Sequence, residues 1–199
     1  MGTRGFMGLV IDGQSKIGYV HWDSYPYGLG VSTLEALRTL LLADSGDQVA
    51  TLARQLEVVK SDTKPSLEQQ ERLADYADTN VSTKSLDEWY VLLRRTHGNL
   101  VRTLKAGYIE DASDFPYDSL FAEWGYLIDF DTKVFEAYRG FQDAPHTLGR
   151  FATGTGPDRM KTLGHHYYPC ALVGMWSFDA LPTNDEFLTA LEENDDDED

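Results

Sequence analysis

The chain of 199 residues contains one cysteine, Cys170. A single cysteine excludes an internal disulfide, and no Cys-x-x-Cys or His-x-x-x-His pair offers the spacing of a structural zinc site. Long apolar runs are also missing: the longest, residues 36–43, is interrupted by Arg38 and is far shorter than the ~20 residues that span a bilayer. We therefore expect a cytoplasmic protein with no metal, no cofactor and no membrane contact.

Basic residues are scarce, since 17 Lys and Arg stand against 33 Asp and Glu. Seven of the acids lie in the last eight residues, EENDDDED. Carboxylates that repel one another and have no apolar partners stay solvated, so we expect a single domain at 1–191 and a disordered acidic tail at 192–199. Without the seven tail acids the net charge is still −9. Such a charge disfavours direct binding of nucleic acid, which needs Lys and Arg for the phosphates.

Both ends of the chain show strand patterns. Aromatic and branched residues on either side of Asp12-Gly13 predict one hairpin, and a similar alternation around Asp131-Thr132 predicts a second. A further buried strand is expected before the C-terminal helix. The predicted strands are residues 6–11, 16–22, 124–130, 133–138 and 170–178.

The middle of the chain has helical periodicity instead. Ser32 with Glu35, Ser66 with Gln69 and Ser85 with Glu88 have the spacing of a capping box, and Gly107 is a typical helix terminator. Thr183 with Glu186 opens a last helix, and residues 140–167 are predicted to form a long loop. Five central helices are predicted, at residues 32–43, 48–59, 66–77, 86–95 and 99–105. With no repeat and no linker, the chain is predicted to be one layered α+β domain with helices on an antiparallel sheet.

The densest cluster of polar side chains follows the first hairpin. On a strand, Tyr19, His21 and Asp23 share one face, which makes them a reasonable pocket wall. The Gly28-Leu29-Gly30 turn and Ser32 then open a helix, whose free amides could receive a phosphate or carboxylate with Arg4 nearby. The candidate ligand site comprises Arg4, Tyr19, His21, Asp23, Tyr25, Gly28, Gly30 and Ser32.

The same segment has a purely structural interpretation. Pro26 and the two glycines satisfy the backbone of an ordinary strand-to-helix turn. Neither the dinucleotide-binding fingerprint nor the P-loop is complete, because the third glycine of the first and the lysine of the second are absent. Both interpretations stay open at the level of sequence.

Other residues with chemical potential have simpler explanations. Asp129 and Asp131 fit turn chemistry, Cys170 fits a small buried apolar residue, and Trp89 with Tyr90 fits a helix core rather than a cofactor platform. His165 and His166 are adjacent, so on a strand they point to opposite faces and are a poor metal pair. No catalytic residue is assigned.

Four segments carry a resemblance to a known family: MGTRGFMGLVIDG, HWDSYPYGLG, EWGYLIDFDTKVFEAYRGF and YYPCALVGMWSFDALP. They resemble an uncharacterised family of small proteins of tailed-phage and actinobacterial genomes. The resemblance implies an accessory protein that acts inside a bacterial host cell, and it implies no activity. The layout is also similar, more weakly, to the N-terminal-nucleophile hydrolases. Those enzymes expose Cys, Ser or Thr as their first residue. Here, removal of Met1 leaves Gly2 as the first residue, and exposing Thr3 would need an additional proteolytic cleavage.

Three functions follow as hypotheses. The first is binding of a small anionic or nucleotide-like ligand, which in a phage context would sequester a host signal. The second is an acidic protein-interaction module, inhibitor or DNA mimic, that docks onto a basic host protein. Hydrolysis is the least favoured, because covalent catalysis needs an activated nucleophile beside a base. In each case the protein is expected to be a monomer or a small homo-oligomer.

Overall fold

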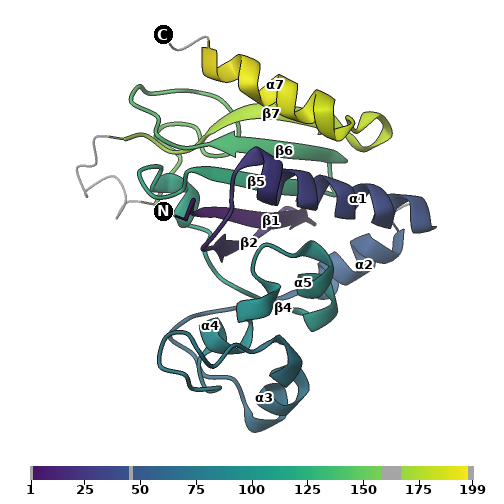
Figure 1. The fold of residues 1–199 in the computed structure, drawn as a ribbon, viewed down its shortest axis with the longest axis vertical. Coiled ribbons are helices and arrows are strands. Elements are labelled where there is room, and N and C mark those ends of the chain that lie inside the picture. Colours follow the sequence, from purple (N-terminus) through teal and green to yellow (C-terminus); the bar gives the residue numbers. More distant parts are fainter. Residues whose placement is uncertain (1, 45–46, 158–166, 197–199) are drawn as a thin grey trace.

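The computed structural model describes residues 2–44, 47–157 and 167–196. Its centre is a five-stranded sheet with the strand order β2-β1-β5-β6-β7, in which N-terminal and C-terminal strands lie side by side (Figure 1). The fold is thus α+β, as the sequence predicts. The strands are β1 Gly5–Ile11, β2 Gln14–Val20, β5 Trp124–Asp129, β6 Val134–Arg139 and β7 Ala171–Ser177.

The centre of the sheet differs from the prediction. Three of its four pairings are antiparallel, but β1 and β5 run parallel, from Gly5 opposite Trp124 to Val10 opposite Asp129. Parallel neighbours need a long crossover, and the whole helical middle of the chain supplies it. The sheet is therefore mixed rather than antiparallel.

The two predicted hairpins are present. At the first turn Asp12 and Gly13 both have positive φ, 51° and 72°, as a two-residue turn that matches the strand twist requires. The carboxylate of Asp131, from the second turn, accepts hydrogen bonds from the amides of Asp12 and Gly13, each at 2.8 Å. One hairpin turn therefore holds the other.

Five helices lie between β2 and β5 in the described residues, in agreement with the prediction, and a last helix follows β7. Ser66 and Gln69 form the predicted capping box of α3, and Gly107 ends α5 at a φ of 74°. Thr183 and Glu186 exchange hydrogen bonds at the beginning of α7. The helices are α1 Val31–Asp44, α2 Asp47–Gln55, α3 Leu67–Leu73, α4 Trp89–Leu92, α5 Leu100–Ala106 and α7 Asn184–Asp196.

Three of the predicted helices are too long. The one predicted at 66–77 becomes α3, which ends at Leu73, and a 3-10 turn at Ala74–Tyr76. The helix predicted at 48–59 stops at Gln55, and Glu57–Val59 forms a short strand, β3, parallel to β4 (Tyr108–Glu110). The buried ammonium of Lys16 explains the stop, because it donates to the carbonyls of Ala53, Arg54 and Leu56 at 2.7–3.0 Å. The helix predicted at 86–95 shrinks to α4 and a 3-10 turn at Arg94–Thr96.

Within the described residues, α-helices pack on one face of the sheet. In Figure 1, α1 and α7 lie along this face, and their Leu34, Leu37 and Phe187 pack with Tyr126 and Phe135 in the main core. On the opposite face, no α-helix of the described part of the chain contributes to the buried cluster. Phe6, Leu127 and Tyr138 pack there against Phe151 and Cys170.

A smaller helical part extends from the edge of the sheet beyond β2 (Figure 1). It contains α3, α4 and β4 and has its own cluster of buried residues, which includes Leu73, Trp89 and Leu92. A backbone hydrogen bond joins it to the sheet, from the amide of Ala112 to the carbonyl of Ile17 at 2.8 Å. The junction of the two parts is where the candidate site lies.

The C-terminal segment overlaps the predicted tail. The backbone of α7 is helical as far as Asp196, and 197–199 lie outside the described residues. The disorder of 192–199 stays a prediction. Among the described helices, none combines the length and the apolar character that a membrane span requires.

Candidate functional site

Two of the predicted site residues, Tyr19 and His21, contact each other at the end of β2. The Tyr19 hydroxyl lies 2.6 Å from His21 Nδ1. Burial is the main cause that raises the pKa of Tyr19 and lowers the pKa of His21, and the charges of Arg94 and Arg4 lower the latter further. Both groups are therefore neutral at pH 7, and they share a hydrogen bond whose donor is set by the tautomer of His21.

Arg4 belongs to the same surroundings, although its side chain is exposed. Its guanidinium lies 5.6 Å from the centroid of the Phe121 ring, and its charge acts on both Tyr19 and His21. The structure thus brings Arg4, Tyr19 and His21 together.

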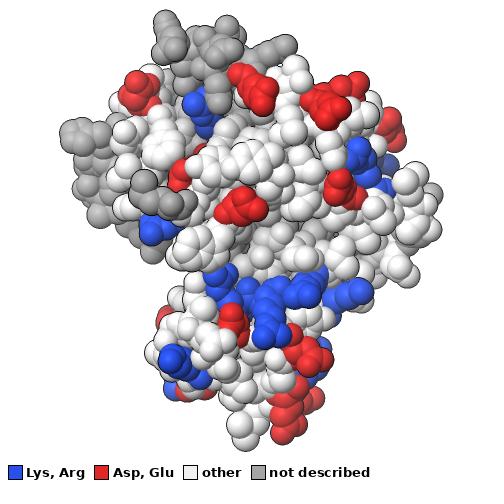
Figure 2. All heavy atoms as spheres, viewed as in Figure 1, with Lys and Arg blue, Asp and Glu red and all other residues white. Residues whose placement is uncertain are grey.

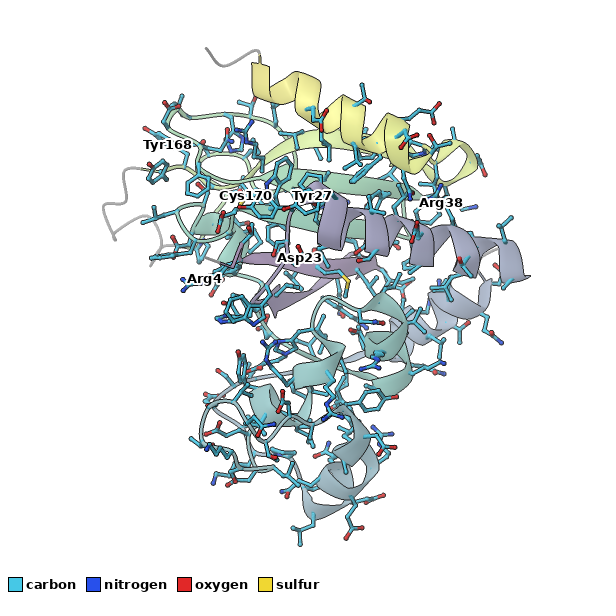
Figure 3. The ribbon with its side chains drawn as sticks, viewed as in Figure 1. Arg4, Asp23, Tyr27, Arg38, Tyr168 and Cys170 are labelled. Atoms are coloured by element: carbon cyan, nitrogen blue, oxygen red, sulfur yellow. The ribbon has the colours of Figure 1, made fainter. Side chains whose placement is uncertain are left out.

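Asp23 and Tyr25 do not join them as predicted. Strand alternation ends at Val20, and Asp23 has a φ of 60°, so the chain turns there and the shared strand face is lost. The ring of Tyr25 stacks on that of Tyr27, with centroids 5.3 Å apart. In Figure 3, Asp23 and Tyr27 lie beside the beginning of α1, apart from Arg4.

The amides of the glycine turn are not free, contrary to the assumption behind the predicted anion site. The chain enters α1 through a π-helical turn, η1 (Pro26–Gly30), in which the amides of Gly28 and Gly30 donate to the carbonyl of Tyr25. The amide of Leu29 donates to the carbonyl of Asp23, and the hydroxyl of Ser32 donates to that of Leu29. The purely structural interpretation of this turn fits the geometry.

Gly30 is required by packing, which yields a first prediction. A Cβ at this position would lie 2.9 Å from the rings of both Phe187 and Tyr126. Because both rings are buried, we expect Gly30→Ala to lower the free energy of unfolding by about 1–3 kcal/mol in urea titrations. Ser32→Ala, at an exposed position in the first turn of α1, loses only the hydrogen bond to the carbonyl of Leu29 and should cost about 0.5 kcal/mol. Equal stability of the two variants would contradict this role for Gly30.

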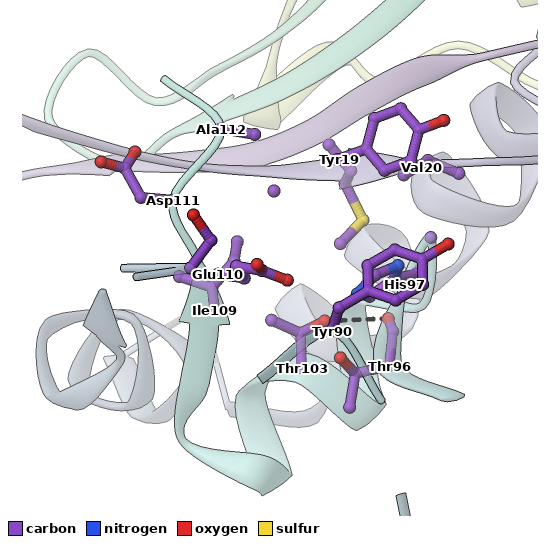
Figure 4. A pocket seen from close by; sticks show the side chains of 14 residues that line it. Tyr19, Val20, Tyr90, Thr96, His97, Thr103, Ile109, Glu110, Asp111 and Ala112 are labelled. Carbon is purple, nitrogen blue, oxygen red and sulfur yellow. Dashed lines mark hydrogen bonds between the residues drawn. The ribbon is translucent and has the colours of Figure 1, made fainter. Parts of the chain in front are cut away.

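A cavity of about 180 Å³ lies between the β1–β2 hairpin and the helical part (Figure 4). The hairpin contributes Tyr19 and Val20, and the helical part contributes Tyr90, His97 and Glu110. Tyr19 is thus the one predicted site residue that lines it. The remaining lining residues are Met7, Gly18, Ser61, Thr96, Gly98, Thr103, Ile109, Asp111 and Ala112.

One wall of the cavity is formed by the rings of Tyr90 and His97, and the guanidinium of Arg94 lies next to them. The rings of Tyr90 and His97 meet edge to face with centroids 5.3 Å apart, and the Arg94 guanidinium lies 5.5 Å from the Tyr90 centroid. Burial, with help from Arg94 and His21, lowers the pKa of His97 to about 4. His97 is therefore neutral at pH 7, and its Nδ1 lies 3.5 Å from Arg94 Nη1.

The other wall carries a carboxylate, that of Glu110. Figure 4 shows it directed into the cavity, whereas the carboxylate of Asp111 points away. Burial raises the pKa of Glu110, and the charge of Glu88 raises it further. Within the described residues, no hydrogen bond or ion pair reaches this carboxylate. The cavity thus combines a half-buried carboxylate with aromatic rings.

Basic side chains gather at the same junction. Figure 2 shows Lys and Arg in a band where the upper and lower parts meet, at the level of α5, while acidic side chains on this face are scattered. In the sequence, the segment that leads into and through α5 contributes Arg94, Arg95, Arg102 and Lys105. A signal for them exists in the sequence, because residues 89–109 contain no acid in an otherwise acidic chain.

The remaining candidates have structural roles. Asp129 accepts from the amides of Asp131 and Thr132, which is turn chemistry as predicted. Cys170 is fully buried, and burial raises the pKa of its thiol, so it is no nucleophile. Trp89 is a core residue as predicted, but the neighbouring Tyr90 faces the cavity.

Two further points concern metals. His165 and His166 lie outside the described residues. In the part of the chain that the structure describes, no group of three or more His, Cys, Asp or Glu side chains could hold a metal ion.

Compared with models of protein families, with curated proteins and with solved structures, the chain matches none. The two resemblances stated from the sequence are therefore neither supported nor opposed by these comparisons. Any function has to be argued from the geometry of the site.

Proposed function

We propose that the protein binds a small anionic, nucleotide-like ligand at the junction between the sheet and the helical part. The observation that carries the proposal is the cavity itself, where Tyr19 and Tyr90 line a space beside the Arg94 guanidinium. Aromatic rings stack on a heterocyclic base, and arginine is the side chain best suited to a phosphate. The ring would occupy the cavity and the phosphate would lie outside, towards Arg94.

The size of the cavity supports a single ring system as occupant. Its volume of about 180 Å³ is close to that of engineered cavities that bind benzene, ~150 Å³. A whole nucleotide does not fit, so only the base enters. This differs from the first hypothesis in its details, since Tyr19 and Arg4 stay in the site while the glycine turn leaves it.

Binding without turnover is the proposed mode of action. The histidines at the site, His21 and His97, both have pKa values lowered by burial and by arginine charges. Neither is poised for proton transfer at pH 7, where a catalytic base needs a pKa near the working pH. In the bacterial cytoplasm that the phage resemblance implies, such a protein would sequester a host signal. Docking of its acidic surface onto a basic host protein remains the alternative.

A thermal-shift screen with the four ribonucleoside monophosphates tests the proposal. At a ligand concentration 100 times Kd, binding should add about 2.7 kcal/mol of stability, which for a chain of this size raises Tm by about 5–11 °C. Arg94→Gln removes the charge that faces the phosphate and should weaken binding about tenfold to a hundredfold.

The matched control is Arg54→Gln, the same change at an exposed arginine that pairs with Asp12. It should bind like the wild type. The corresponding nucleosides, which lack the phosphate, should bind wild type and Arg94→Gln equally. If none of the four nucleotides shifts Tm, the proposed function is wrong and the docking alternative gains.

A further inference from the structure

Within the proposed site, the carboxylate of Glu110 is held by a strand, is directed into the cavity and has no hydrogen-bond partner among the described residues. It ends β4, where Val59 is its partner across the short parallel pair. The next two amides are also held, since Asp111 donates to the carbonyl of Val59 and Ala112 to that of Ile17, both at 2.8 Å. The backbone of Glu110 is therefore anchored on both sides, and its carboxylate enters the cavity from a rigid strand.

Two other polar groups of the cavity are already engaged. Thr103 donates its hydroxyl proton to the carbonyl of Thr96 at 3.1 Å, as Figure 4 shows, and His97 Nδ1 faces Arg94. What the wall lacks is a donor for the carboxylate of Glu110. A half-buried carboxylate without a protein donor is poorly solvated, and this partial burial raises the pKa of Glu110. An occupant that supplies N–H groups at this point would satisfy this carboxylate.

We infer that the site selects a guanine-type base, one that presents two adjacent N–H donors to the carboxylate of Glu110. This inference rests on the proposed function and names the ligand class. Guanine offers the ring N1–H and the exocyclic amino group side by side, a pair that matches the two oxygens of a carboxylate. Hypoxanthine offers only the ring N–H. Adenine places a ring acceptor beside its amino group and would set a lone pair against the carboxylate.

The expected discrimination follows from the worth of a bidentate pair, ~1–3 kcal/mol. Guanosine monophosphate should bind the wild-type protein about 5- to 150-fold more tightly than adenosine monophosphate, with inosine monophosphate between them. Titration calorimetry at one fixed salt concentration measures all three. This comparison needs no variant, so it does not depend on the folding of a mutant.

Glu110→Gln then tests the residue. It keeps the size of the side chain but replaces one oxygen by an amide that cannot accept, so the preference for guanosine over adenosine monophosphate should fall by at least about fivefold. Asp111→Asn is the matched control, because that carboxylate points away from the cavity and its loss should leave the preference unchanged.

The outcomes separate the inference from the proposed function. Equal binding of guanosine and adenosine monophosphate by the wild type overturns the inference and leaves nucleotide binding in place. A guanosine preference that survives Glu110→Gln overturns the role of Glu110. Binding of no nucleotide overturns the proposed function, and the inference falls with it.

Discussion

Replacing Arg150 by methionine should lower the free energy of unfolding by about 3–5 kcal/mol at pH 7. The Arg150 guanidinium donates to both oxygens of Glu136, at 2.8 and 3.1 Å, and to Asp129. The carboxyl side chains are 7% and 2% exposed, so the change leaves two buried negative charges without their cation. Methionine keeps the apolar stem of the side chain, which confines the loss to the charge. Urea denaturation measures it.

The stability that Arg150→Met loses relative to the wild type should depend on pH. Burial opposes ionisation of Asp129, but hydrogen bonds from Thr132 and the charge of Arg150 outweigh it and hold the pKa below its ordinary value. A lowered folded-state pKa contributes stability above the unfolded value of ~3.9 and loses it as pH falls through the folded pKa. The gap between wild type and Arg150→Met should therefore narrow below pH 4. A gap that is constant from pH 7 to pH 3.5 would contradict this electrostatic origin.

The control is Arg54→Met. Its ion pair with Asp12 lies on the surface, with side chains 52% and 63% exposed. Exposed pairs are screened by solvent, so this change should cost less than about 1 kcal/mol. If the two variants lose the same stability, the buried cluster around Arg150 contributes no more to stability than an exposed ion pair.

Phe187→Ala should be about as damaging, at roughly 3–5 kcal/mol. The side chain of Phe187 is fully buried, and its ring lies 5.1 Å from that of Trp176 and about 6 Å from that of Phe135, measured between centroids. Truncation removes the main contact of α7 with the sheet and leaves a cavity under the helix. Near-ultraviolet circular dichroism should also lose the signal of Trp176, because its ring packs against Phe187.

Leu67→Ala serves as the comparison for that variant. Leu67 is 77% exposed at the beginning of α3, so the same kind of truncation should cost less than about 0.5 kcal/mol. A loss of stability in Phe187→Ala that does not exceed this value would show that α7 is not held by its aromatic residue.

Local signals in the sequence located most elements of the fold. The Asp12-Gly13 turn, the Ser66–Gln69 capping box and the Gly107 terminator act over a few residues, and each is present as predicted. The errors concern contacts between distant residues. Nothing near Glu57–Val59 reveals that Lys16 will end α2, and three residues are too few for strand alternation to be visible.

For the site, too, local sequence signals predicted some residues, whereas contacts between distant residues were missed. The alternation of polar residues along a strand predicts that Tyr19 and His21 lie together, as they do. The same pattern fails for Asp23, because the strand ends at Val20. Glu110 could not be found from its neighbours, since it meets Tyr19 only through the packing of the helical part on the hairpin. The acid-free run at 89–109 was a usable signal for the basic junction.

The parallel pairing of β1 with β5 also has a kinetic consequence. Contacts across this pair join Arg4 to Glu123, 119 residues along the chain. Closing a loop of that length costs about 4 kcal/mol of chain entropy before the contacts between the two strands form. Folds dominated by such distant contacts fold slowly. Helices that form early in the intervening segment shorten the effective loop. The two walls of the cavity, the β1–β2 hairpin and the helical part, are both connected to the sheet that forms when β1 pairs with β5. The protein should therefore become able to bind its ligand only in the last and slowest phase of refolding.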